Sequence, residues 1–184
     1  MRFLIAILML GAVSFSSPPA SADQNDPQLD GLFQRLHDAP NVADARRIER
    51  RIWIVWTRHD DAAVNGLMRT GLGQMERRDY GAALDTFQAM VDLAPEFAEA
   101  WNKRATVHWL LGHYQESLSD IERTLSLEPR HFGALSGRGL VYIGLEEWDL
   151  ALEAFQDALE VYPQMVGPRV NSEAIRKMRE GRAI

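Results

Sequence analysis

The side chains best suited to chemistry in this chain are its histidines and one serine that lies near glycines. His108 and His113 are five residues apart, on different faces of an expected helix and across an expected turn, and neither fits the H-E-x-x-H spacing of helical zinc sites. Ser136 lies in the stretch 131–137, which lacks the G-x-S-x-G pattern and stands at a helix start. The chain has no cysteine and therefore no thiol nucleophile. The sequence thus predicts no enzyme, no metal site and no cofactor.

The dominant feature of the chain is a period of 34 residues, which five columns of similar side chains share without an insertion. The columns are aromatic (Tyr80, Tyr114, Trp148), small (Ala83, Ser117, Ala151), leucine (Leu84, Leu118, Leu152), large apolar (Phe87, Ile121, Phe155) and proline (Pro95, Pro129, Pro163). Self-similarity at a fixed period indicates a repeat architecture, in which each unit stacks on its neighbours.

Each column has a physical role in a pair of helices. The small residues of the second helix let the two helices approach closely, and Gly71, Ala105 and Gly139 do the same from the first helix. The large apolar side chains fill the space between units. Proline ends the second helix, because it has no N–H to donate and disfavours the helical region for the residue before it.

The columns also resemble a known family. The pattern W-x2-L-G-x2-Y, then A-x3-F, then P is typical of the tetratricopeptide repeat (TPR). Trp101 opens the second unit as this pattern requires, and Ala83 with Phe87 and Ala151 with Phe155 match its second half. The chain therefore resembles the TPR family. The resemblance implies an all-α, right-handed superhelical solenoid with three repeats, at 64–97, 98–131 and 132–165.

The N-terminal residues are expected to lie outside the repeats. Arg2, an apolar run over 3–13 and the small residues at 20–22 predict a signal peptide, residues 1–22, that is cleaved after Ala22. The run is shorter than the ~20 residues that a membrane-spanning helix needs. Residues 23–28 are expected to form a flexible leader.

The array is expected to be capped at both ends. Residues 29–63 predict a degenerate helix pair, with one helix over 29–39 and a second, N-capped by Asn41, that reaches about His59. Residues 166–184 are expected to cover the apolar face of the last repeat. There Gly167 and Pro168 interrupt the chain, and a final helix begins at Asn171 or Ser172 and reaches about Arg179. The expected layout is nine helices.

Composition narrows the class of partner and compartment. The chain has 20 basic and 26 acidic residues, a net charge of −6, which gives no support to nucleic-acid binding. The absence of cysteine excludes disulfides and lipid attachment at a cysteine. An exported chain without cysteine must be held by its core alone, which suits a bacterial periplasm.

The family resemblance implies a groove, because stacked repeats form an extended concave surface that the first helix of each pair lines. The predicted groove residues are Asn65, Met68, Leu72, Met75, Glu99, Asn102, Thr106, Trp109, Gly133, Ser136, Leu140 and Ile143. Such an apolar, methionine-containing groove suits an extended or helical segment with apolar anchors. Leu72 and Ile143 can equally pack beneath the cap helices.

Some family members hold a partner's C-terminal carboxylate in this groove with lysines and asparagines. This chain departs from that motif, because Met68 and Leu72 stand where a lysine and an asparagine are expected. Only Asn102 and Lys103 resemble it.

A second candidate surface is a basic stripe beside Trp53 and Trp56, formed by Arg46, Arg47, Arg50 and Arg51. In an acidic chain this stripe can meet anionic headgroups or an acidic partner, or it can be a solvated face that is partly paired with acids such as Glu49.

Two further arginines, Arg104 and Arg138, stand where the family pattern has leucine. We expect them to cover apolar surface and to pair with a carboxylate such as Asp120 or Asp149 rather than to bind a ligand.

The function that these patterns favour is a periplasmic protein–protein interaction module. It is expected to bind a segment of a protein partner in envelope assembly or in maturation of an exported complex. The alternative is a membrane-tethered scaffold that keeps its N-terminal segment and uses the basic stripe near lipid. A mature N-terminus at Asp23 separates the two hypotheses.

Overall fold

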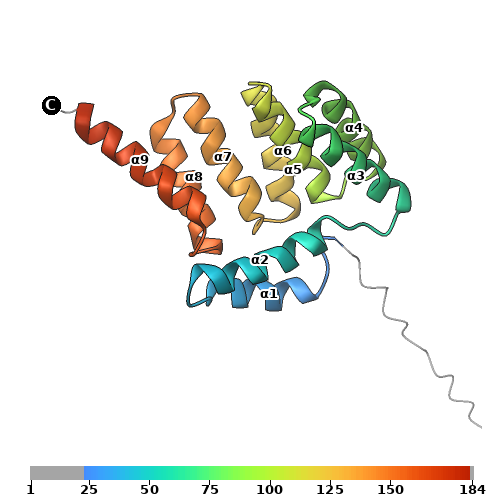
Figure 1. The fold of residues 1–184 in the computed structure, drawn as a ribbon, viewed down its shortest axis with the longest axis horizontal. Helices are drawn as coiled ribbons and strands as arrows, with labels where there is room; N and C mark the ends of the chain where they lie inside the picture. Colours follow the sequence, from blue (N-terminus) through green and yellow to red (C-terminus); the bar gives the residue numbers. More distant parts are fainter. Residues whose placement is uncertain (1–22, 183–184) are drawn as a thin grey trace, which may run out of the picture.

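The computed structural model describes residues 23–182, which form nine α-helices and no strand (Figure 1). The helices are α1 Gln28–His37, α2 Val42–Trp56, α3 Ala62–Glu76, α4 Tyr80–Leu93, α5 Ala98–Leu110, α6 Tyr114–Leu127, α7 Phe132–Gly144, α8 Trp148–Val161 and α9 Val166–Arg182. No described helix is both long and apolar enough to cross a membrane. The predicted signal peptide and its cleavage after Ala22 lie outside the described residues.

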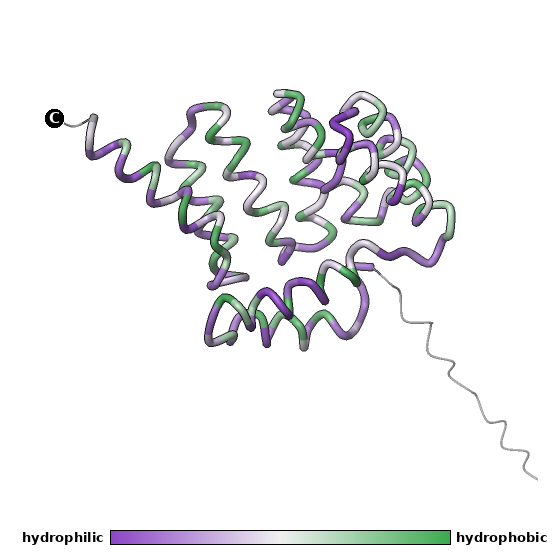
Figure 2. Tube along the Cα trace, viewed as in Figure 1, coloured by the Kyte–Doolittle hydropathy of each residue, from purple (hydrophilic) through white to green (hydrophobic). Residues whose placement is uncertain are grey.

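The predicted solenoid of helix pairs is confirmed. The pairs α3–α4, α5–α6 and α7–α8 stand side by side, and each packs on the next. Hydrophobic and hydrophilic residues interleave along the helices (Figure 2). The helices α5 and α7 are the most enclosed, since their only exposed residues are Leu110 and Gly144 at their ends. The small column is fully enclosed, with Ala83 and Ala151 at 0% exposure and Ser117 at 1%. Ser117 satisfies its hydroxyl by donating to the Ala105 carbonyl at 2.8 Å.

Glycines set the distance between paired helices. A Cβ at Gly71 would lie 2.5 Å from the Phe87 ring, and one at Gly139 would lie 2.3 Å from Phe155. The middle repeat has Ala105 at this position, opposite the smaller Ile121. Where the first helix has alanine in place of glycine, the second helix has isoleucine in place of phenylalanine. The combined volume of the pair is therefore kept similar, and the packing stays dense.

The turn between paired helices is the same in every repeat. Arg78, Gly112 and Glu146 have φ of 60°, 77° and 60°. In each turn, the N–H of the following residue bonds the carbonyl five positions back, as from Asp79 to Gln74 at 2.9 Å. Glycine adopts a left-handed φ at little cost, but a residue with a Cβ does not. The backbone of Arg78 and Glu146 is therefore strained.

The α1–α2 hairpin does not continue the stack. It lies crosswise at one edge of the array (Figure 1), against the turns that lead into α7 and α9. Arg130 pairs with Asp30 at 2.7 Å, and Tyr162 donates to Glu49 at 3.2 Å. Gln24, which precedes α1 in the predicted flexible leader, is 9% exposed and donates to the Glu96 carbonyl at 2.6 Å, so this end of the leader is docked on the array. The hairpin thus bridges repeats that are distant in sequence.

Two expected helix boundaries need correction. Asn41 does N-cap α2, accepting from the Asp44 N–H at 3.0 Å, but α2 ends at Trp56 and not near His59. The last helix begins at Val166, so Gly167 and Pro168 do not interrupt it and neither Asn171 nor Ser172 caps it. Proline is compatible with the first turn of a helix, where its missing N–H has no partner to lose.

Candidate binding groove

A pocket of about 180 Å³ lies between the second and third repeats, beside α5 and α7. We call it the central pocket. It is lined by Asn102, Ala105, Thr106, Trp109, Ser117, Ile121, Gly133, Ser136, Gly137, Leu140 and Met165. The structure therefore brings six of the predicted groove residues into one hollow: Asn102, Thr106, Trp109, Gly133, Ser136 and Leu140. None of the lining side chains is charged.

Two further hollows are one of about 510 Å³ at the first repeat and one of about 190 Å³ before the last helix. The first-repeat pocket is lined by Thr57, Arg58, His59, Ala62, Asn65, Met68, Arg69 and Leu72. The C-terminal pocket is lined by Arg46, Glu49, Tyr162, Met165, Val166 and Gly167. Met165 belongs to both the central and the C-terminal pocket, so these two hollows adjoin.

Several predicted groove residues have structural duties. Asn65 holds the loop between α2 and α3, donating to the carbonyls of His59 at 2.5 Å and Asp61 at 3.0 Å. Met68 lines the first-repeat pocket but is only 3% exposed. Met75 and Ile143 line none of these three pockets and pack against the core.

A buried ionic cluster lies beside the central pocket. Glu99 is 1% exposed and pairs with Lys103 at 2.7 Å. It also accepts from Asn102 at 2.8 Å, and His131 Nε2 lies 3.0 Å from it. Because His131 Nδ1 accepts from the Ala134 N–H at 3.0 Å, the proton of a neutral imidazole is on Nε2, which donates to Glu99.

The charge of Glu99 follows from this surrounding. Burial raises the pKa of the Glu99 carboxyl, but the charge of Lys103 and the His131 hydrogen bond outweigh it, so that the pKa lies below its ordinary value. Glu99 is therefore ionised, and the charge of Lys103 balances it, so it is not a free acid in the groove.

This cluster also fixes the position of α2. The indole of Trp56 stacks on His131 with ring centroids 4.0 Å apart and planes at 7°. Lys103 lies over the Trp53 ring at 5.0 Å. A Cβ at Gly133 would lie 2.8 Å from Trp53, so glycine is what admits the indole. Sequence reasoning missed this contact. One signal in the sequence could have indicated it. At the position 34 residues before and after His131 the chain has the apolar residues Phe97 and Met165, so a histidine there is unusual.

The residues that resemble a carboxylate-binding motif are therefore engaged. Asn102 and Lys103 both contact Glu99, so each has a donor engaged by that carboxylate.

The basic stripe is exposed, but its aromatic edge is not. Arg46, Arg47, Arg50 and Arg51 are all exposed on α2. Arg47 pairs with Asp44, while Glu49 accepts from Tyr162 rather than from an arginine. Trp56 is 1% exposed and Trp53 is half-buried beneath Lys103, so the aromatic residues beside the predicted basic stripe pack into the protein, and a binding role of the arginines is still a prediction.

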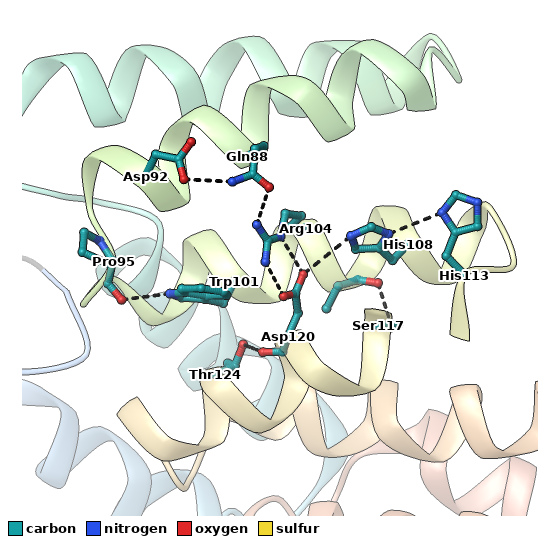
Figure 3. A network of polar contacts seen from close by, with 11 residues as sticks. Gln88, Asp92, Pro95, Trp101, Arg104, His108, His113, Ser117, Asp120 and Thr124 are labelled. Carbon is teal, nitrogen blue, oxygen red and sulfur yellow. Dashed lines mark hydrogen bonds and ion pairs between the residues drawn. The ribbon is translucent and has the colours of Figure 1, made fainter. Parts of the chain in front are cut away.

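Arg104 is structural, as expected. Figure 3 shows its guanidinium binding both oxygens of Asp120, at 2.8 and 2.6 Å, and Gln88 of the preceding repeat at 2.6 Å. The hydrogen bond to Asp120 raises the pKa of Arg104. Arg138 likewise pairs with a carboxylate, but with Asp157 and not with Asp120 or Asp149. Asp149 pairs instead with Arg179 of α9.

The two histidines at the end of this network meet across the turn. His108 Nδ1 lies 3.5 Å from His113 Nδ1, although their spacing suggested different faces (Figure 3). The turn through Gly112 brings the chain back far enough for the rings to approach. Among residues 23–182, no group of three or more histidine, aspartate or glutamate side chains is placed to hold a metal ion.

Comparisons with known proteins agree with the geometry. The family model described as tetratricopeptide repeat matches residues 68–125 and 103–166. A TPR repeat-containing protein of Rhizobium etli is 38% identical over 136 residues, which cover 74% of this chain and 67% of that protein. Hsp70-Hsp90 organizing protein 3 of Arabidopsis thaliana is 31% identical over 132 residues, which cover 72% of this chain and only 22% of that protein.

Solved structures share the fold. The TPR domain of Sgt2 from Aspergillus fumigatus has a TM-score of 0.63 at 21% identity, covering 67% of this chain and 84% of that one. The first TPR of Spaghetti (RPAP3), bound to an HSP90 peptide, has a TM-score of 0.61 at 20% identity, covering 64% and 93%. MamA from Desulfovibrio magneticus has a TM-score of 0.59 at 21% identity, covering 82% and 83%.

Proposed function

Because the chain belongs to the tetratricopeptide repeat family, we propose that it binds a segment of a partner protein in the central pocket and along the adjoining face of α3, α5 and α7. Proteins of this fold serve as protein-interaction modules, and one structural neighbour holds an HSP90 peptide. The observation that carries the proposal is the central pocket itself, a hollow between two repeats with uncharged walls and Trp109 on one side.

The size of the pocket suits one side chain of a partner. A volume of about 180 Å³ with a half-buried tryptophan in the wall is typical of an anchor site for a large apolar residue. Asn102, Thr106 and Ser136 line the same hollow, but Asn102 already bonds Glu99 and Thr106 donates to the Asn102 carbonyl at 2.8 Å. The walls therefore offer mainly apolar contact.

The test is capture of partners by the wild type and by Trp109→Ala. We expect the variant to lose most of the partner signal in a pull-down from periplasmic extract, identified by mass spectrometry, while it stays helical. Because Trp109 also packs against the core cluster of the middle repeat, the melting temperature should fall, and capture is compared at a temperature where both proteins are folded. Leu93→Ala is the matched control, because Leu93 is 49% exposed and lines none of the three pockets. Equal capture by all three proteins would count against the groove.

We further propose that the protein works in the bacterial periplasm, in envelope assembly or in maturation of an exported complex. The support is the N-terminal sequence, with Arg2, the apolar run at 3–13 and the small residues at 20–22. Fractionation of a Gram-negative host should find the protein in the periplasm with Asp23 as its first residue. Retention of Met1 in a membrane fraction would favour the tethered scaffold instead.

A further inference from the structure

The chain is docked on the repeat array from Asp23 onward, although the sequence predicts a flexible leader there. Asp23 and Gln24 are each 9% exposed. The Gln24 amide reaches the turn between α4 and α5, where its Nε2 donates to the Glu96 carbonyl at 2.6 Å and its Oε1 accepts from the Ala98 N–H at 3.2 Å. We call residues 23–26 the latch.

The latch completes the start of α5. This helix begins at Ala98, and its N-cap Phe97 has no side chain that bonds the free N–H groups of the first turn. Gln24 supplies one acceptor from 74 residues away in the sequence. At the start of α7 a cap is supplied locally, because His131 accepts from the Ala134 N–H. The middle repeat therefore takes from the leader a contact that the third repeat makes by itself.

The backbone of the latch is folded into turns and is not extended. The Asp26 N–H bonds the Asp23 carbonyl at 3.1 Å, and the Asn25 N–H bonds Asp23 Oδ1 at 2.7 Å. The Leu29 N–H bonds the Asp26 carbonyl at 3.0 Å, and the Leu29 side chain is 1% exposed. Hydrogen bonds and burial thus hold the chain from Asp23 into α1.

We infer that the latch controls processing: the bond after Ala22 is cut while the latch is open, and closure of the latch protects that bond. This inference rests on the proposed export and adds when the cut is made. A protease needs accessible residues on both sides of the bond, and a buried, hydrogen-bonded segment must first unfold locally. Asp23 and Gln24, on the carboxyl side of the bond, are buried when the latch is closed.

The order of the two events decides which form of the protein arises. Cleavage is a hydrolysis by a signal peptidase, in which water leaves a carboxylate on Ala22 and an ammonium group on Asp23. A chain that is cut before the latch closes becomes a free module. A chain whose latch closes first keeps residues 1–22 and stays tethered. The free module and the tethered scaffold are then two products of one chain.

Cleavage of the folded precursor tests this inference. The full chain, residues 1–184, is folded in detergent micelles and incubated with bacterial signal peptidase, and mass spectrometry follows the appearance of Asp23 as the first residue. We expect the folded wild type to resist, because cleavage of a docked segment follows the fraction of chains in which it is open. The same precursor, diluted from urea straight into the peptidase, should be cut at least about tenfold faster.

Two variants open the latch from opposite sides. Gln24→Ala removes both side-chain hydrogen bonds to the array. Ala98→Pro removes the N–H that Gln24 Oε1 accepts and lies far from the cut in the sequence, so that it leaves the peptidase's recognition sequence unchanged. Proline suits this first position of α5, because Phe97 before it is already extended. We expect each variant to keep its helicity and to be cut about tenfold faster than the folded wild type.

Asn25→Ala is the matched control. Asn25 lies in the latch, but its side chain is exposed and the backbone N–H that bonds Asp23 is unchanged. This variant should be cut as slowly as the wild type.

The outcomes separate the latch from the proposed export. If the folded wild type is cut as fast as the Gln24 variant, the latch is overturned, while the appearance of Asp23 still supports export. Acceleration by Gln24→Ala without acceleration by Ala98→Pro would place the effect in recognition by the peptidase and would also overturn the latch. A precursor that stays uncut even from urea overturns both the cleavage site and the latch, and leaves the groove to its own test with Trp109→Ala.

Discussion

The repeat array and the α1–α2 hairpin are built on different rules. In the array, each helix packs on its sequence neighbours, and the same turn, the same small–large contact and the same proline recur every 34 residues. The hairpin packs on residues that are far away in sequence, such as His131 and Tyr162, and no second copy of its contacts exists in residues 23–182. The array is held by local periodicity, and the hairpin by a few unique long-range contacts.

The difference bears on function. A preceding repeat would have stacked on α3 and extended the groove. The hairpin instead crosses the edge of the array and supplies a rim with Arg46 and Trp53 beside pockets that the repeats form. The surface proposed to bind a partner is thus composed of both regions, and its specificity depends on how firmly the hairpin is docked.

The strongest test of the comparison is Trp56→Ala. Trp56 is 1% exposed and packs on Phe33, His131 and Phe132. Truncation of such a buried aromatic typically costs about 3–5 kcal/mol. We expect hydrogen exchange to show lost protection in α1 and α2 with little change in α3 to α6, because the hairpin contacts the array mainly at its edge.

A uniform loss of protection in all helices would contradict this comparison, because it would make the hairpin and the array one cooperative unit. Trp148→Ala supplies the matched control, since Trp148 is half-buried in the array and packs far from the hairpin. That change should leave the protection of α1 and α2 intact.

Packing inside the array is tested by Gly139→Ala, which we expect to destabilise by about 1–3 kcal/mol through overpacking against Phe155. The double variant Gly139→Ala with Phe155→Ile copies the Ala105–Ile121 pair of the middle repeat and should recover part of the loss. Chemical denaturation gives both values.

Gly81→Ala serves as the control for helix propensity. Gly81 lies in α4, and a Cβ there would meet nothing within 4 Å. This change should be neutral or stabilising by up to about 1 kcal/mol. An equal loss at Gly81 and Gly139 would show that glycine removal, and not the contact with Phe155, is the cause.

The turns offer a smaller and opposite effect. Arg78→Gly or Glu146→Gly should stabilise the array by about 0.5–1 kcal/mol, because glycine relieves the positive φ that both residues adopt. The reverse change, Gly112→Ala, should destabilise by a similar amount. Thermal melts of the three variants check the prediction, and a loss of stability in Arg78→Gly would contradict it.

The sequence predicted the array well and the hairpin poorly, for one reason. Repeated columns report on contacts between neighbours, so the spacing predicts the helix pairs and the small residues where they meet. It leaves both Asp120 and Asp149 open as partners of Arg104, and it does not show that Phe87 and Phe155 pack on the glycines of their own units. The position of the hairpin depends on Trp56 meeting His131 and Trp53 meeting Gly133, and such pairs leave no period in the sequence. The same limit applies to the groove. The first-helix positions were predicted, but the contact of His131 with Glu99 and the packing of Trp53 on Gly133 needed the three-dimensional structure.

The smallest expected effect concerns pH and lies within the array. Burial lowers the pKa of His108, more than the attraction of Asp120 and Glu116 raises it, and Arg104 and His113 lower it further. A lowered folded-state pKa means that the unfolded chain takes up the proton at higher pH. The contribution of His108 to stability is therefore complete above its unfolded pKa of about 6.5 and is lost as pH falls through its folded pKa.

The variant His108→Gln copies Gln74, which holds the same position one repeat earlier. We expect its free energy of unfolding to decline less than that of the wild type between pH 7.5 and pH 5, while the titration of His108 by NMR in the wild type shows a midpoint below the ordinary value. Parallel pH profiles for the two proteins would contradict this assignment. His108 contacts His113 and Asp120, and neither belongs to the hairpin. At pH 5, hydrogen exchange should therefore show lower protection of α5 and α6 in the wild type than in the variant. The protection of α1 and α2 should be the same in both proteins.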